Sequence, residues 1–326
     1  MGYKSIDGLM RHLRTSGIQI TGSRQKQQLT NTGYFHGYKG YRFFANSGNR
    51  IPFSSYNEVY ATIQYDTKLK TLFYPKIMYI ETAVKNISLK CIMDKVGTEN
   101  IQDMLDNIVS SFKNAPSGSL PNTRKAFQTR KLSLHASIQN ALSRAYKYEN
   151  PKITHFYEHM SYNHVPLWAL FEIMTMGDFG FLLQCLNYDT REYISREIGI
   201  NLSSDTNREL IYKYIYALKD LRNAIAHNDV IFDTRFRKTN PTKPMKQCLK
   251  LEMGLPYVDF KNIGDYIILV CYYLKLLNVS KTEIKTFIRD FEKITGDYKK
   301  AVDKKVANMV LNPYLPSRMS ILKKYI

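Results

Sequence analysis

The sequence predicts an all-α protein, and three observations favour this fold class. Apolar residues recur at intervals of three and four in several long segments, which is the spacing of one helix face. Breaker residues gather in a few places, mainly within residues 97–122, so they separate long elements. The sequence contains no strand-rich region, no internal repeat and no glycine-rich phosphate loop. With 326 residues, 44% of them hydrophobic, the chain is long enough to bury a substantial core.

The N-terminal part is expected to contain a short helix, a polar stretch, an aromatic patch and one long helical segment. The short amphipathic helix covers residues 3–16, and residues 15–32 are polar. Residues 34–44 carry six aromatic side chains, with His36, Lys39 and Arg42 among them. They form either a turn that packs under a helical bundle, which the crowding of the rings favours, or an aromatic and basic surface that faces RNA. From Ser54 a helical pattern runs to about Lys95, and Pro75 is expected to kink or divide it.

The middle of the chain combines breaker residues with positive charge. Residues 97–122 are expected to form a loop, and the loop and basic segment together span about 97–150. No acidic residue occurs between Asn107 and Tyr148. Such a one-signed segment is either a solvated face or a track for the backbone of RNA, and we favour the track. Its candidate RNA-binding residues are Lys113, Arg124, Lys125, Arg130, Lys131, Arg144 and Lys147.

Helices are expected again after the basic segment. Pro166 opens an apolar helix that Gly177 is expected to end, and a second helix covers about residues 179–198. A third begins near Ser204 and Asp205, both good N-cap residues. Its apolar positions recur at helical spacing up to Ile225, and Asn228 is a plausible stop because Asn tolerates the left-handed turn that ends helices.

The C-terminal part, residues 236–326, has more net positive charge per residue than residues 1–235. Residues 236–326 hold 18 basic and 8 acidic residues, and helices are expected over 263–278 and 280–295. We therefore expect two parts: a helical domain over 1–235 and a basic helical extension over 236–326.

The net charge and the placement of the cysteines indicate what kind of partner the protein binds and in which cellular compartment it lies. The formal net charge is +19, which indicates a polyanionic partner such as RNA, DNA or an anionic membrane. The four cysteines are scattered without metal-ligand spacing, and the N-terminus has no apolar signal core. No apolar run approaches the ~20 residues of a membrane span. We expect a cytoplasmic protein without a membrane partner, and no metal or cofactor.

A polar column at the end of the 204–227 helix carries the candidate chemistry. Asn223 and His227 are one turn apart on one ridge, after Asp220 on the same face. Arg222 is about 140° from His227 around the helix, so the two side chains do not share a ridge. Its long guanidinium can still swing to the helix edge, where it flanks the column and could meet a phosphate that lies along it. His can transfer protons near neutral pH, and Arg can hold a phosphate. The alternative is structural: a His that complements the helix dipole and an Arg paired with a carboxylate.

The stretch from Leu221 to His227 resembles the R-N-x-x-x-H signature of the HEPN superfamily. Other pieces, in order, resemble its Abi-like (AbiD/AbiF) branch, and together they cover roughly residues 5–235. These pieces are Asn31-Thr-Gly-Tyr34-Phe35-His36-Gly37-Tyr38, Tyr65-Asp66, Ile80-Glu81, Val165-Pro166-Leu-Trp168-Ala-Leu-Phe-Glu172 and Met176-Gly177. Each piece is short, and the ordered set is specific.

This resemblance implies a HEPN-like helical bundle and a metal-independent RNA endonuclease, acting as a toxin or an abortive-infection effector. Arg222, Asn223 and His227 would be catalytic, and Asp220 and Glu81 would support them. The expected products are a 2′,3′-cyclic phosphate and a 5′-hydroxyl. The resemblance also leaves room for control by a cognate small non-coding RNA and implies a homodimer in the active form. The alternative is a non-catalytic RNA-binding protein that uses the same basic surface.

Overall fold

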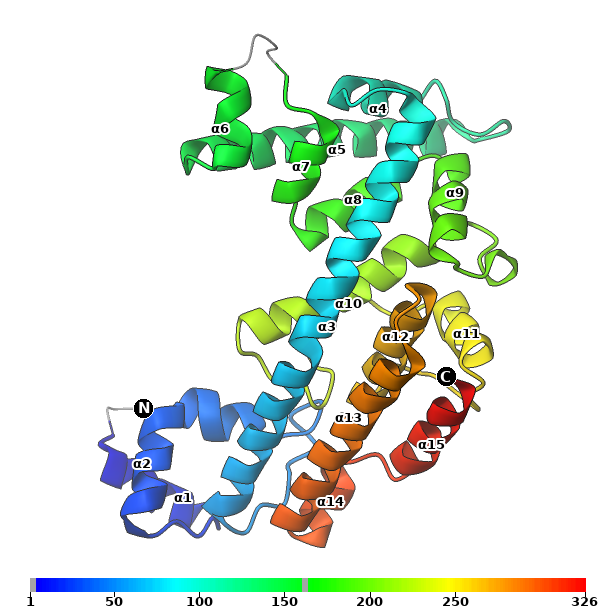
Figure 1. Ribbon diagram of the computed structural model, residues 1–326. Helices are drawn as coiled ribbons and strands as arrows, with labels where there is room; N and C mark the ends of the chain where they lie inside the picture. The colour runs from blue at the N-terminus through cyan, green and yellow to red at the C-terminus, as the bar shows by residue number, and fades with distance from the viewer. Residues whose placement is uncertain (1–3, 160–163) are drawn as a thin grey trace. The chain divides into compact units, whose positions relative to one another are not determined.

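The computed structural model describes residues 4–159 and 164–326, and within them it confirms the all-α fold class (Figure 1). Helices account for the regular structure among the described residues, which also contain four isolated β-bridges. The chain divides into two compact units. Unit 1 holds residues 1–77, 220–240 and 249–326, and unit 2 holds residues 78–219 and 241–248. The boundary expected near residue 235 stays a prediction.

Unit 1 is built from helices at both ends of the chain. The short helices α1 and α2 contact each other, and α2 leads directly into the π-helix η1. Helix α13 contacts α12, α14 and α15. The elements are α1 (Ile6–Thr15), α2 (Gly22–Thr32), η1 (Gly33–Lys39), the first half of α3 (Tyr56–Val96), the end of α10 (Leu210–Ala226), the end of α11 (Lys243–Glu252), α12 (Ile263–Leu276), α13 (Lys281–Ala301), α14 (Lys304–Val310) and α15 (Leu315–Tyr325).

Unit 2 is organised around the long basic helix α5. This helix contacts α6, α7 and α8, and its inner face is apolar, with Leu134, Ile138 and Leu142 buried. The elements are the second half of α3, α4 (Ile101–Asn107), α5 (Pro121–Lys147), α6 (Pro151–Glu158), α7 (Leu167–Ile173), α8 (Met176–Cys185), α9 (Tyr188–Ile198), the 3₁₀-helix η2 (Leu202–Ser204), most of α10 and the start of α11.

Helix α3 is one undivided helix of 41 residues that contributes to both units (Figure 1). Its N-terminus is fixed by Glu58, whose carboxylate accepts hydrogen bonds from the backbone N–H groups of Ser54, Ser55 and Asp303. Pro75 lies inside the helix without interrupting it, so the expectation of a division there was wrong. Packing of the apolar side chains on both sides of Pro75, among them Phe73 and Ile77, outweighs the one lost backbone hydrogen bond.

Other boundaries also differ from the expectations. The first apolar helix after Pro166 ends at Ile173, and Gly177 lies in the first turn of the next helix. The capping box of Thr175 and Asp178 starts this next helix, and that signal outweighs the glycine. The segment 179–198 is two helices, because Asn187 caps a new start at Tyr188. Helix α4 lies within residues 97–122, which were expected to form a loop, and α2 lies in the segment described only as polar.

Among the C-terminal helices, α12 is buried along most of its length. Every residue of α12 from Ile263 to Leu274 is buried. Asp265 at its start forms a buried ion pair with Arg318 of α15. Residues 249–326 are therefore an integral part of unit 1, with a core of their own.

Candidate active site

The signature residues lie at the C-terminal end of α10. This helix begins at Leu210, later than the N-cap residues predicted, and Asp205 accepts hydrogen bonds from the backbone N–H groups of Glu209 and Leu210. The guanidinium of Arg222 donates to the side-chain oxygen of Asn223 over 3.0 Å. The guanidinium that flanks the polar column thus reaches one of its side chains, that of Asn223. The structure brings Arg222 and Asn223 together, one helical turn before His227.

His227 is exposed at the end of the helix, and the turn that follows fixes its position. Asn228 has a left-handed φ of 56°. The backbone N–H of Asp229 donates to the carbonyl of Ala224, and that of Asn228 donates to the carbonyl of Ile225. This pair of bonds is the Schellman motif, in which His227 is the C-cap residue. The predicted stop at Asn228 is therefore confirmed.

Asn228 also joins the signature turn to two other segments of unit 1. Its side-chain oxygen accepts a hydrogen bond from Lys70 Nζ over 2.8 Å. Its side-chain nitrogen lies 3.0 Å from Nε2 of His36 in η1. Through one amide, the turn after His227 contacts α3 and the aromatic patch. Three segments that are far apart in the sequence therefore meet at the candidate site.

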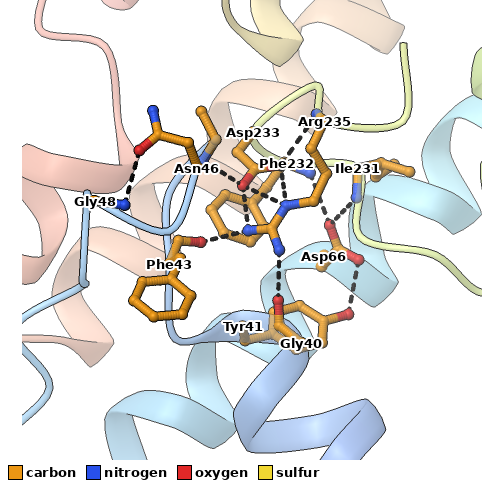
Figure 2. A network of polar contacts seen from close by, with 11 residues as sticks. Gly40, Tyr41, Phe43, Asn46, Gly48, Asp66, Ile231, Phe232, Asp233 and Arg235 are labelled. Carbon is orange, nitrogen blue, oxygen red and sulfur yellow. Dashed lines mark hydrogen bonds and ion pairs between the residues drawn. The ribbon is translucent and has the colours of Figure 1, made fainter. Parts of the chain in front are cut away.

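A buried carboxylate holds the backbone that follows this turn (Figure 2). One oxygen of Asp66 accepts from the backbone N–H groups of Ile231 and Phe232, at 2.9 and 2.8 Å. The other oxygen accepts from the Tyr41 hydroxyl at 2.9 Å and forms an ion pair with Lys70 at 2.9 Å. Burial and the neighbouring Asp66 raise the pKa of Tyr41, which keeps this hydroxyl protonated as a donor. Asp66 is thus fully engaged in anchoring the site.

A second polar contact set ties the same segment to the loop after η1 (Figure 2). Asp233 accepts from the backbone N–H of Ala45 over 2.8 Å and forms an ion pair with Arg235. The guanidinium of Arg235 donates to the carbonyls of Gly40 and Phe43. The aromatic patch is therefore fastened to residues 231–235, and its Tyr34, Tyr38 and Tyr41 are buried. The burial of these three rings fits the interpretation of the patch as a structural turn.

Phe35 is the exception within the patch, because 72% of its surface is exposed. The ammonium of Lys39 lies 4.6 Å from the centre of its ring. A cavity of about 370 Å³ opens at the same element, and four of its lining residues are basic. They are His12, Lys39, Arg42 and Arg50. The element η1 thus carries the exposed ring of Phe35, the exposed His36 and part of the lining of a basic cavity.

The two residues expected to support the site, Asp220 and Glu81, are both buried and have polar partners. The buried carboxylate of Asp220 accepts hydrogen bonds from the backbone N–H groups of Lys238 and Thr239, at 2.9 and 2.8 Å. It thereby anchors the segment that follows Phe236. Glu81 is buried in unit 2, where it forms an ion pair with Lys85 of the same helix over 3.0 Å. That pair supplies the partner that a buried carboxylate requires.

The candidate RNA-binding residues belong to unit 2, six of them on α5 and Lys113 just before it. Lys113, Lys125, Arg144 and Lys147 are exposed, whereas Arg124, Arg130 and Lys131 are half-buried. Lys131 forms an ion pair with Asp106 over 2.8 Å, which offsets its charge. Arg124 donates to the carbonyl of Ser119. The four exposed cations are therefore the best placed to meet an RNA backbone.

From the sequence, His36 and Asp66 were named within the stretches that resemble the Abi-like branch but were given no role in the site, and Lys70 was not named. A signal for Asp66 was present, since a carboxylate on an otherwise apolar helix face needs donors. For His36 and Lys70 no local signal exists, because their contacts with Asn228 span 192 and 158 positions.

Among residues 4–159 and 164–326, no group of three or more His, Cys, Asp or Glu side chains could hold a metal ion. In those same ranges no helix is both long and apolar enough to cross a membrane.

Comparison with known proteins agrees with the pattern of these residues. The family model described as Abi-like protein matches residues 27–233, which include η1, Asp66, Lys70 and the signature turn. No curated protein matches the chain, and no solved structure does. The match covers well over half of the sequence, and the chain therefore belongs to the Abi-like protein family.

Proposed function

We propose that this protein is a metal-independent RNA endonuclease of HEPN type that acts as a toxin or effector in abortive infection. Membership of the Abi-like family indicates a role in abortive infection, a form of phage defence. The observation that carries the nuclease proposal is the end of α10. There an Arg222–Asn223 pair stands one turn before an exposed His227 whose position is fixed by the Schellman turn.

The proposed reaction is attack of a ribose 2′-hydroxyl on the adjacent phosphate. The O2′–P bond forms while the P–O5′ bond breaks, so the 2′-hydroxyl loses a proton and the 5′-oxygen gains one. Arg222 would stabilise the negative charge that develops on the phosphate oxygens, and its hydrogen bond to Asn223 holds it in place for this. His227 would transfer a proton. The products are a 2′,3′-cyclic phosphate and a 5′-hydroxyl.

RNA binding is proposed for two basic surfaces, one in each unit. In unit 2 the exposed cations of α5 and Lys113 would follow the phosphate backbone. In unit 1 the basic cavity at η1 would hold a phosphate, and the exposed ring of Phe35 would stack on an unpaired base. A small regulatory RNA would use the same surfaces, which fits the net charge of +19.

The nuclease proposal is tested by incubating the purified protein with mixed-sequence RNA in the presence of excess chelator. We expect cleavage with 2′,3′-cyclic phosphate ends, measured as resistance of the new 3′ ends to phosphatase before mild acid treatment. The His227→Ala variant should bind RNA and retain its helical circular dichroism but not cut. His159→Ala, which removes an exposed histidine of another element, is the matched control. Binding without any cleavage by the wild type would instead indicate a non-catalytic RNA-binding protein.

We further propose that the active form is a homodimer in which the two 220–229 segments lie at or near a twofold axis. Mixing Arg222→Ala chains with His227→Ala chains tests this. If one site uses residues of both chains, the mixture should cut faster than either variant alone, because some sites then receive both intact groups. Full wild-type activity in a protein shown to be monomeric at the assay concentration would exclude the dimer.

A further inference from the structure

A second histidine stands beside the signature turn in the same chain. His36 is exposed in η1, and its Nε2 atom lies 3.0 Å from the side-chain nitrogen of Asn228, the residue that follows His227. The sequence places the two histidines 191 positions apart, and the polar column of α10 alone offers one. The fold therefore supplies two proton-transfer groups where acid–base catalysis of RNA cleavage needs two.

The hydrogen bonds around Asn228 determine which nitrogen of His36 carries the proton. An ammonium has donors and no acceptor, so the side-chain oxygen of Asn228 must face Lys70. The amide nitrogen then faces His36 and donates, which makes Nε2 of His36 the acceptor. A neutral His36 ring in this arrangement therefore carries its proton on Nδ1. The ion pair of Lys70 with the buried Asp66 holds this chain of contacts in place.

We infer that His36 is the general base of the reaction and that His227 is the general acid, an assignment that rests on the proposed function. Nε2 of His36 carries a lone pair that is aimed at the signature turn. The ribose 2′-hydroxyl takes the place of the Asn228 amide as donor to Nε2 and gives up its proton there as the O2′–P bond forms. His227 gives a proton to the 5′-oxygen as the P–O5′ bond breaks. Exchange with water then restores both histidines.

The position of His227 suits the acid. It is the C-cap residue of α10, where the helix dipole favours positive charge. Both proton-transfer groups thus come from one chain, and a second copy is not required to supply the base. In the proposed dimer the partner would then contribute phosphate binding rather than a second histidine.

The experiment compares two RNA oligomers that differ at one cleavable linkage. One has the ordinary 5′-oxygen, and the other has a bridging 5′-sulfur, which leaves without needing a proton. We expect His36→Ala to lower the cleavage rate about 10²- to 10⁴-fold on both substrates, as removal of a general base does. His227→Ala should lose a similar factor on the oxygen substrate and recover most of it on the sulfur substrate.

His36→Gln separates a base from a residue that merely positions Asn228. A glutamine oxygen can accept the hydrogen bond from the Asn228 amide but cannot take up a proton, so this variant should cut as slowly as His36→Ala. His159→Ala is the exposed-histidine control and should cut at the wild-type rate.

Three outcomes would overturn the assignment: a His36→Ala rate equal to that of the wild type, recovery of activity in His36→Gln, or recovery of His36→Ala on the sulfur substrate. A wild-type protein that cuts neither oligomer nor mixed RNA would refute the proposed function itself. If the wild type cuts RNA and His36→Ala cuts it equally fast, the assignment of His36 as the general base is refuted and the proposed nuclease function is not.

Discussion

Replacing Asp66 by Asn should destabilise unit 1 strongly, because this carboxylate is buried and fully used. Its Oδ1 accepts from two backbone N–H groups, which an amide oxygen can still do. Its Oδ2 accepts from Tyr41 and pairs with Lys70, and an NH₂ group there would face two donors. Removing one partner of a buried ion pair costs about 3–5 kcal/mol. Since two of the four contacts survive, we expect about 3 kcal/mol for Asp66→Asn and more for Asp66→Ala.

The assay is urea unfolding of both variants, monitored by circular dichroism. Thermal denaturation of the same variants gives their Tm values. A loss of ~3 kcal/mol corresponds to a fall in Tm of roughly 6–12 °C for a unit of this size. The matched control is Asp7→Asn, which breaks a Lys–Asp pair of similar length, 2.7 Å, between exposed side chains. Such exposed pairs contribute about 0–1 kcal/mol. The reasoning fails if Asp66→Asn costs no more than Asp7→Asn.

Three further predictions concern pH and charge. Burial raises the pKa of Glu58, but hydrogen bonds from Asp303, Ser54 and Ser55 outweigh it and lower the pKa below its ordinary value. The ionised Glu58 therefore contributes its full stabilisation above about pH 4.5, and this stabilisation is lost as the pH falls through the lowered pKa of Glu58 in the folded protein. In urea unfolding measured at several pH values, Glu58→Gln should reduce the dependence of the free energy of unfolding on pH in this range. The exposed cations of the α5 region are Lys113, Lys125, Arg144 and Lys147. Reversing the charge of all four should reduce the salt dependence of RNA affinity. Lys131→Glu should change this salt dependence little, because Asp106 already offsets the charge of Lys131, and equal effects would contradict the ion-pair argument. Arg42→Ala combined with Arg50→Ala should also weaken RNA binding in filter assays, and unchanged affinity would exclude the basic cavity at η1 as a phosphate site.

The part of the site that could be predicted is the part governed by local rules. Helical spacing predicted the end of α10, and the tolerance of Asn for left-handed backbone predicted the turn at Asn228. The apolar pattern also predicted the extent of α3, from Ser54 to about Lys95. Local rules failed where two signals compete within a few residues. Gly177 suggested a helix end, but the Thr175–Asp178 capping box begins a helix there.

The direction of Arg222 shows the limit of helix geometry. An angle of about 140° from His227 describes where the Cα–Cβ bonds point. A guanidinium stands several bonds further out, so its final position depends on the acceptor it finds. One acceptor here is the side chain of Asn223, the next residue in the sequence. Spacing therefore predicts which face of the helix a long side chain leaves from, and not the groups that it reaches.

The ordered resemblance between residues 31 and 229 acquires a physical meaning from the contacts of Asp66 and Asn228. Its short pieces lie far apart in the sequence, yet His36, Asp66 and the signature turn are joined by hydrogen bonds that run through Lys70. Each link depends on the next: Asp66 holds Lys70, Lys70 orients the Asn228 amide, and that amide sets the proton position on His36. A change at the buried end of this chain should therefore alter chemistry at its exposed end. Asp66→Asn, beyond its cost in stability, should reduce cleavage by protein that remains folded, because it weakens the hold on Lys70 that aims the lone pair of His36.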